Sequence, residues 1–169
     1  KYHPNAEDIE KIDILSSKYT MHLLAEPCKW SPRNIVDLQF SMPFQAAVAF
    51  KNGKVTVDEF DVAYIDDELI KRLMAHTTVA MDEEFERRYP AHYSSAVTIT
   101  MKDGTTYSAT VDDPKGDWRN PVTYEDVVNK FRYLANRVYS DPLRTESIVE
   151  FVNDLENQKD MSELMKLVN

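Results

Sequence analysis

The chain has 169 residues and a formal net charge of −9, because 29 acidic side chains outnumber 20 basic ones. Its hydrophobic fraction of 43% excludes wholesale disorder, and its acidity argues against general binding to nucleic acid or to an anionic membrane. One cysteine excludes an internal disulfide, and three widely separated glycines exclude a glycine-rich phosphate loop.

The chain opens with a predicted strand, followed by short helices. Isoleucines that alternate with charged residues predict a half-buried strand over 9–14. Residues 16–25 favour a short helix that ends before Pro27, since proline removes a backbone donor and restricts the residue before it. The next helix is expected to start at Ser31-Pro32, a capping residue followed by proline at the first helical position.

The middle of the chain is predicted to mix helix and strand. A helix restarts at Pro43 and closes at Gly53, a residue that tolerates the left-handed conformation. Negative charge at 66–68 predicts the start of a further helix, because the helix dipole favours it there. The β-branched stretch 77–81 is strand-like, and the charged stretch 83–88 is expected to form an exposed turn.

A β-hairpin is the clearest local prediction, with its turn at 102–104. A two-residue loop would place the two apolar rows on opposite faces of the hairpin. A three-residue loop pairs Ile99 with Tyr107 and Val97 with Ala109, which puts both rows on one face. The pattern therefore selects the three-residue loop, with its glycine in the left-handed position.

Three helices are predicted after a polar loop at 112–116. The first begins at 123–126, which is close to a capping box, the second at Asp141-Pro142 and the third at Asp160. The first carries one apolar stripe at helical spacing, formed by Val127, Phe131, Leu134 and Val138. Together the elements predict an α+β fold, a two-layer domain with a mostly antiparallel sheet and helices packed on it.

The length fits one domain over residues 1–169. The longest apolar run, 46–50, is far too short to span a membrane, so we expect a cytoplasmic protein. None of the histidines at 3, 22, 76 and 92 has the spacing of a metal ligand pair, so no metal or other cofactor is predicted. His92 lies in a loop-like stretch and is either solvated or within reach of a pocket. Trp118 is expected to anchor its loop on the core rather than to line a site.

Two stretches resemble a known family. Residues 41–50, Ser-Met-Pro-Phe-Gln-Ala-Ala-Val-Ala-Phe, are similar to the Ser-Leu-Pro-Tyr helix of the MmgE/PrpD family. Residues 116–123, continuing to Lys130-Phe131, resemble its Gly…Asn/Lys-Pro-Leu-Ser/Thr…Lys-Phe signature. The hairpin turn falls where the family has an Asp-Gly turn, and 8–12 resembles the strand entry of its smaller domain. The resemblance covers nearly the whole chain.

The resemblance implies the smaller, C-terminal, lid-like domain of such a protein. The family includes 2-methylcitrate dehydratase, an enzyme of propionate metabolism, as well as cis-aconitate decarboxylase and iminodisuccinate epimerase. In these proteins an all-helical domain carries most of the residues implicated in proton abstraction, so the resemblance implies that no catalytic residue lies in this chain. It also implies a metal-independent lyase or isomerase of small di- or tricarboxylic acids, 2-methylcitrate dehydratase-like, with hydro-lyase activity and a homodimeric full-length chain.

The resemblance implies three candidate substrate-binding residues. Ser41 and Phe44 belong to the stretch that resembles the cleft-facing helix, and Gln39 precedes it. The family often has tyrosine at the position of Phe44, so any hydrogen bond from that ring is missing here. For Phe44, packing into the core is an equally good interpretation. The alternative function is a stand-alone, non-catalytic module that binds a partner subunit or a small anion, with no nucleic acid or membrane as partner.

Overall fold

The computed structural model describes residues 4–169, and these divide into two compact units. The first, here called the sheet unit, ends at Pro114 and contains the β-sheet. The second, the helical unit, begins at Lys115 and contains three α-helices. Within the described residues, no helix combines the length and apolarity that crossing a lipid bilayer requires.

The sheet unit is built on a four-stranded mixed sheet in the order β2-β1-β3-β4. Strand β1 pairs in parallel with β2 and antiparallel with β3, and β3 pairs antiparallel with β4. The strands are β1 (Ile9–Ser16), β2 (Thr77–Met81), β3 (Ser95–Met101) and β4 (Thr106–Val111). These elements confirm the α+β class and the mostly antiparallel sheet predicted from the sequence.

Strand β1 alternates as its sequence predicts. Ile12 and Ile14 point into the core and are buried, whereas Lys11 and Asp13 lie on the opposite face and form an ion pair with 2.8 Å between nitrogen and oxygen. This period of two is the reason for a half-buried strand rather than a helix. The predicted strand is confirmed and extends two residues further, to Ser16.

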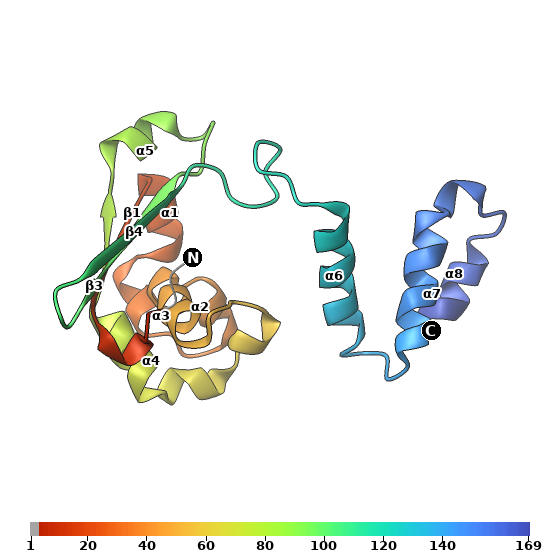
Figure 1. Cartoon of the computed structure of the whole chain (residues 1–169), viewed down its shortest axis with the longest axis horizontal. Helices are drawn as coiled ribbons and strands as arrows, with labels where there is room; N and C mark the ends of the chain where they lie inside the picture. Colours follow the sequence, from red (N-terminus) through yellow and green to blue (C-terminus); the bar gives the residue numbers. More distant parts are fainter. Residues whose placement is uncertain (1–3) are drawn as a thin grey trace. The chain divides into compact units, whose positions relative to one another are not determined.

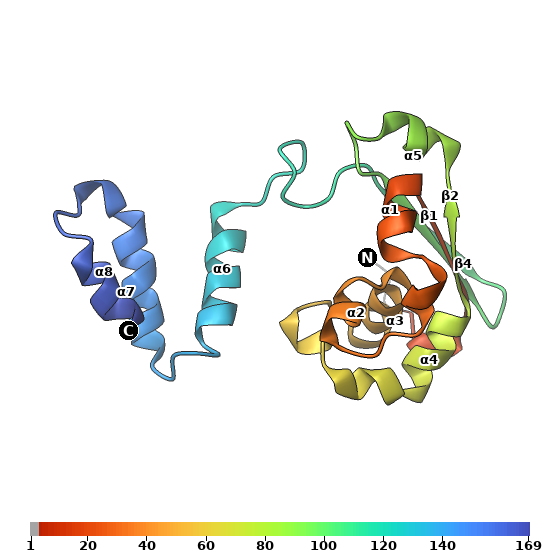
Figure 2. The ribbon, with the colours of Figure 1, turned by 180° about the vertical axis from the view of Figure 1, so that it is seen from behind.

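The α-helices α1 to α4 of the sheet unit lie on one side of the sheet in both views (Figures 1 and 2). The core between the layers joins Phe44 and Val48 of α3 and Leu73 of α4 to the isoleucines of β1. The helices are α1 (Lys18–Leu24), α2 (Ile35–Gln39), α3 (Met42–Asn52), α4 (Glu68–Ala75) and α5 (Glu83–Arg88). Short 3-10 turns cover Ala6–Asp8, Pro27–Trp30, Val57–Glu59 and Val62–Asp66.

Two of the predicted helix features are wrong. The predicted helix start at Ser31-Pro32 is replaced by Asn34, whose side chain accepts a hydrogen bond from the amide of Asp37 at 3.0 Å. Ser31 closes the preceding 3-10 turn, Pro27–Trp30, so it does not serve as the cap of the next helix. The stretch 83–88, predicted as an exposed charged turn, is instead the helix α5. Asp82 caps this helix, and its Phe85 side chain is buried rather than exposed.

The hairpin prediction is confirmed in its register. Val97 pairs with Ala109 and Ile99 with Tyr107, as the three-residue loop requires. Gly104 has a φ of +84°, a left-handed conformation that L side chains rarely adopt. The loop therefore sets which face of the hairpin meets the core.

The helical unit contains α6 (Tyr124–Ala135), α7 (Pro142–Asn153) and α8 (Ser162–Val168), with a 3-10 turn at Leu155–Asn157. The predicted capping box of Thr123 and Asp126 is confirmed, as is the cap of α7 by Asp141. The cap of α8 is Met161, although Asp160 still accepts a hydrogen bond from the amide of Ser162 at 2.8 Å.

The apolar stripe predicted for α6 does not form the buried face of this helix. Val127 and Val138 are 53% and 77% exposed, whereas Val128 and Ala135 are buried. Ile148 of α7 is buried as well. The helical spacing of the apolar residues was predicted correctly, but the buried face of α6 is the one next to the predicted stripe.

Candidate functional site

The N-terminus of α3 carries two of the three residues predicted to bind substrate. Ser41 is fully buried and caps the helix, since its Oγ accepts a hydrogen bond from the amide of Phe44 at 3.2 Å. The same hydroxyl donates a 2.6 Å hydrogen bond to the carbonyl oxygen of Lys29. Ser41 therefore holds the Pro27–Trp30 turn against the start of α3, and both hydrogen-bonding capacities of its hydroxyl are used inside the protein.

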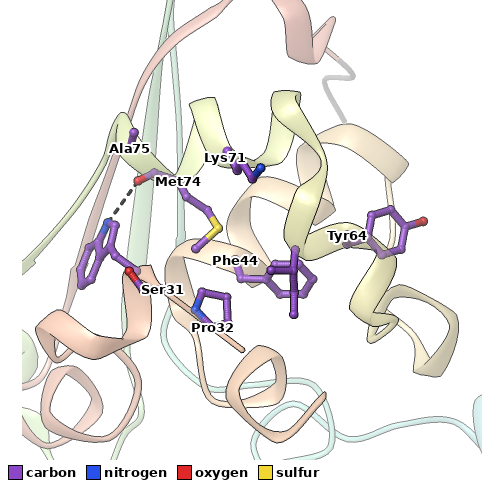
Figure 3. A pocket seen from close by; sticks show the side chains of 9 residues that line it. Ser31, Pro32, Phe44, Tyr64, Lys71, Met74 and Ala75 are labelled. Atoms are coloured by element: carbon purple, nitrogen blue, oxygen red, sulfur yellow. Dashed lines mark hydrogen bonds between the residues drawn. The ribbon is translucent and has the colours of Figure 1, made fainter. Parts of the chain in front are cut away.

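Phe44 is buried in the core and also forms part of the lining of an open pocket. The pocket has a volume of about 370 Å³ and is lined by Trp30, Ser31, Pro32, Phe44, Tyr64, Ile65, Lys71, Met74 and Ala75. In Figure 3, Tyr64 and Ser31 lie on opposite sides of Phe44. The Trp30 indole, which also lines the pocket, donates a 3.1 Å hydrogen bond to the carbonyl of Met74. Phe44 is therefore packed into the core and also borders this pocket.

Gln39 is placed differently from the other two candidates. It is the last residue of α2, its side chain is exposed, and it does not line the pocket that includes Phe44. Its backbone carbonyl accepts a 2.6 Å hydrogen bond from the side chain of Gln45. The backbone of Gln39 thus ties α2 to α3, while its own amide group remains at the surface.

Charged groups at the far end of α3 and the start of α4 are held by internal partners. Lys51 donates a hydrogen bond to Asp67, and this contact lowers the pKa of the Asp67 carboxyl despite its partial burial. Burial alone would raise the pKa of Glu59, but hydrogen bonds from Thr56 and Asn52 outweigh it, so the pKa is lowered. These carboxylates are ionised structural groups rather than proton acceptors poised near neutral pH.

Among the described residues that line the pocket at Phe44, Lys71 is the one with a charge. Its ammonium group forms ion pairs with Glu68 at 3.1 Å and with Asp66 at 3.5 Å. The hydrogen bond to Glu68 raises the pKa of Lys71, which therefore stays protonated. A ligand in this pocket meets a cation that already has two carboxylate partners.

A second pocket shares Ser31 and Pro32 with the first. It has a volume of about 400 Å³ and is lined by Cys28, Lys29, Ser31, Pro32, Arg33 and Asp37. Sequence reasoning did not single out Lys29 or Arg33. The signal available in the sequence was two cations four positions apart, close before the Ser41 stretch, in a chain with a net charge of −9.

The second stretch that resembles the family forms a loop and the start of α6. Gly116 has a φ of +103°, and its amide donates to the carbonyl of Asn120 at 2.8 Å. Asp126 accepts hydrogen bonds from Lys115 and Thr123, which lower its pKa to about 2. Trp118 is 78% exposed and stacks with the Arg119 guanidinium at 4.3 Å. The prediction that Trp118 anchors this loop on a core is wrong.

None of the described histidines, at 22, 76 and 92, lines either pocket. His92 is oriented by Asp113, with 2.9 Å between Nδ1 and the carboxylate, and His22 of α1 contacts Glu26, which lies after the end of that helix. His3 lies outside the described residues. Among residues 4–169, no group of three or more histidine, cysteine, aspartate or glutamate side chains is placed to hold a metal ion.

A mixed four-stranded sheet covered by helices, with two open pockets beside a serine-capped helix, defines an α+β domain that carries a further helical unit. The sequence model of the MmgE/PrpD C-terminal domain matches residues 1–155. The chain therefore belongs to the MmgE/PrpD family, and the resemblance seen in the sequence is confirmed.

Several characterised proteins are similar to this chain. Cis-aconitate decarboxylase from Mus musculus is 27% identical over 132 residues, which cover 78% of this chain and 27% of that protein. A cis-aconitate decarboxylase-like protein from Aspergillus oryzae is 30% identical over 132 residues, with the same coverage. Cis-aconitate decarboxylase from Aspergillus terreus is 28% identical over 150 residues, which cover 84% of this chain and 30% of that protein. The matched region thus spans less than a third of each relative's length.

Proposed function

We propose that this chain is the C-terminal domain of a metal-independent lyase of small tricarboxylic acids, and that it closes over an active site supplied mainly by a helical domain. The family match over residues 1–155 carries the proposal. Among the reactions implied by the resemblance, we favour decarboxylation over dehydration or epimerisation, because three similar proteins are cis-aconitate decarboxylases or are named after them. The full-length protein is proposed to be a cytoplasmic homodimer.

Decarboxylation of a tricarboxylate sets clear demands on the surroundings of the substrate. The carbon–carbon bond to one carboxylate breaks, carbon dioxide leaves, and the electron pair that remains on the substrate is taken up by a proton. The remaining carboxylates need cations or hydrogen-bond donors in a closed cleft. In our proposal the sheet unit supplies some of these groups, and the acid and base come from outside this chain.

The three predicted substrate-binding residues take different parts in this proposal. Ser41 positions the Pro27–Trp30 turn through its hydrogen bond to Lys29 rather than touching substrate itself. Phe44 forms one wall of the pocket beside this turn. Gln39 is available at the surface for a contact with the closed active site.

A chimera tests the proposal directly. The matched segment of mouse cis-aconitate decarboxylase is replaced by the corresponding part of this chain, and consumption of cis-aconitate is followed by proton NMR together with release of carbon dioxide. We expect turnover by the chimera and none by the 169-residue chain alone. A folded but inactive chimera contradicts the proposed equivalence of the two domains. Turnover by the isolated chain contradicts the placement of the acid and base outside it.

The native protein gives a second, independent test. An antibody against this chain reports the mass of the protein in its source cells. A species far heavier than 19.6 kDa supports a two-domain enzyme. A species near 19.6 kDa that copurifies with no helical subunit favours the alternative, a stand-alone module that binds a small anion or another partner.

A further inference from the structure

The pocket next to Cys28 has the size of a small-molecule site. Its volume is about 400 Å³, and its lining comes from a single stretch of chain between Cys28 and Asp37. Small-molecule pockets in proteins typically measure roughly 300–1,000 Å³. A tricarboxylic acid fits such a volume, so the charge of the lining decides what it can hold.

The lining contains two cations without an acidic partner. Within residues 4–169, neither the Lys29 ammonium nor the Arg33 guanidinium forms an ion pair, although the sheet unit is rich in such pairs. The Lys29 nitrogen lies 5.7 Å from the ring centre of Phe40. Both cations line the same pocket, in a chain with a net charge of −9. Their charges are available to an external anion.

The pocket also contains a carboxylate, Asp37, which is engaged in holding its frame. Its Oδ2 accepts hydrogen bonds from the amide of Arg33 at 2.9 Å and from the side chain of Asn34 at 3.1 Å. Asp37 therefore fixes the backbone that carries the Arg33 side chain. One acidic group against two cations leaves the lining with a net positive charge.

The backbone on the other side of the pocket is fixed as well. The buried Ser41 hydroxyl binds the carbonyl of Lys29 at 2.6 Å, and the Trp30 indole binds the carbonyl of Met74 at 3.1 Å. The segment between Lys29 and Arg33 is thus tied to α3, to α4 and to its own following helix. Because the backbone is held, ligand binding needs to order only the two long side chains.

We infer that Lys29 and Arg33 form a subsite that binds two carboxylate groups of a small polycarboxylate. The inference rests on the proposed function, which it deepens by naming the residues of this chain that hold the substrate. The planar guanidinium of Arg33 suits a bidentate contact with one carboxylate, and the Lys29 ammonium contributes a point charge for another. The subsite selects di- and tricarboxylates over monocarboxylates, since a single carboxylate engages only one of the two cations.

The only cysteine of the chain provides a reporter at this place. Cys28 is exposed and lines the pocket, so its alkylation by neutral iodoacetamide senses occupancy. Citrate is the probe, and acetate at matched ionic strength is the reference. We expect citrate at tens of millimolar to slow alkylation at least threefold and acetate to leave the rate unchanged. An equal rate with citrate and acetate overturns the inference.

Paired variants locate the protection. K29Q/R33Q removes both cations and is expected to abolish the effect of citrate. K18Q/K102Q removes the same charge from lysines that form no ion pair among residues 4–169 and lie outside this pocket, and it is expected to keep the protection. Equal protection in both double variants contradicts the inference. If K29Q/R33Q loses its circular dichroism spectrum, the single variants K29Q and R33Q carry the same comparison.

The chimera described above separates this inference from the proposed function. In an active chimera, K29Q/R33Q is expected to raise KM at least tenfold with little change in kcat, whereas K18Q/K102Q leaves both constants unchanged. An active chimera whose KM is insensitive to K29Q/R33Q refutes the subsite and leaves the function standing. Protection of Cys28 in a chain whose chimera is inactive supports the subsite and refutes the function.

Discussion

Substitution of Ser41 by alanine is expected to destabilise the sheet unit by about 2–4 kcal/mol. The loss of a helix N-cap costs about 1 kcal/mol. The carbonyl of Lys29 also loses its 2.6 Å hydrogen bond from a hydroxyl that is fully buried, and leaving such a group unpaired costs roughly 1–3 kcal/mol. The two losses are separate, because one concerns the amide of Phe44 and the other the Lys29 carbonyl.

Urea unfolding monitored by tryptophan fluorescence measures this loss. The exposed Trp118 is replaced by phenylalanine in all samples, so that Trp30 alone reports on the sheet unit. With a urea dependence of about 2 kcal/mol/M, the midpoint is expected to fall by about 1–2 M. The control is Ser31→Ala, because Ser31 is exposed and its hydroxyl caps no helix.

A midpoint for Ser41→Ala that lies within about 0.3 M of the Ser31→Ala midpoint would refute the reasoning, given a urea dependence of about 2 kcal/mol/M. That result would mean that the Ser41 hydroxyl is exchanged for water without loss. It would also mean that the hydrogen bond from Ser41 does not help to hold the segment around Lys29.

Two further predictions concern the hairpin and the helical unit. Gly104→Ala is expected to lower stability by about 1 kcal/mol or more in thermal unfolding, since its φ is +84°, whereas Lys102→Ala is expected to change little. Hydrogen bonds, first from Lys115 and then from Thr123, lower the pKa of Asp126 from 3.8 to about 2. The folded-state pKa is thus the lower one, so the stabilisation is present above pH 4 and is lost as the pH falls through about 2. Asp126→Asn should therefore be less stable than the unchanged chain at pH 7, and the difference in helical circular dichroism should close towards pH 2; a difference independent of pH contradicts this assignment.

Features encoded by neighbouring residues could be predicted from the sequence. The cap pair of Thr123 and Asp126, the left-handed Gly53 at the end of α3 and the register around Gly104 each depend on residues a few positions apart. The sheet order follows less directly, but the alternation in β1 and the hairpin were enough to predict a mostly antiparallel sheet.

Features set by distant contacts could not be predicted. Helix α2 is capped by Asn34 rather than by the predicted Ser31, because Ser31 closes the preceding turn, which the Trp30 indole ties to α4. Helix α5 forms around Phe85, which is buried only in the folded unit. The candidate subsite escaped prediction for the same reason, since whether Lys29 is paired depends on where every acidic side chain comes to lie.

The central position of β1 determines the order in which the sheet can be assembled. Strands β3 and β4 pair Thr100 with Thr106, but Ile12 of β1 pairs with Thr77 and Ile99, far along the chain. During synthesis at roughly 5–20 residues per second, the partners of Ile12 follow it after about 3–17 s. In that interval the apolar side chains of this segment have no partner strand and are open to self-association. Refolding followed by pulsed hydrogen exchange should protect the β3–β4 hairpin before β1, and simultaneous protection of all four strands would contradict this order.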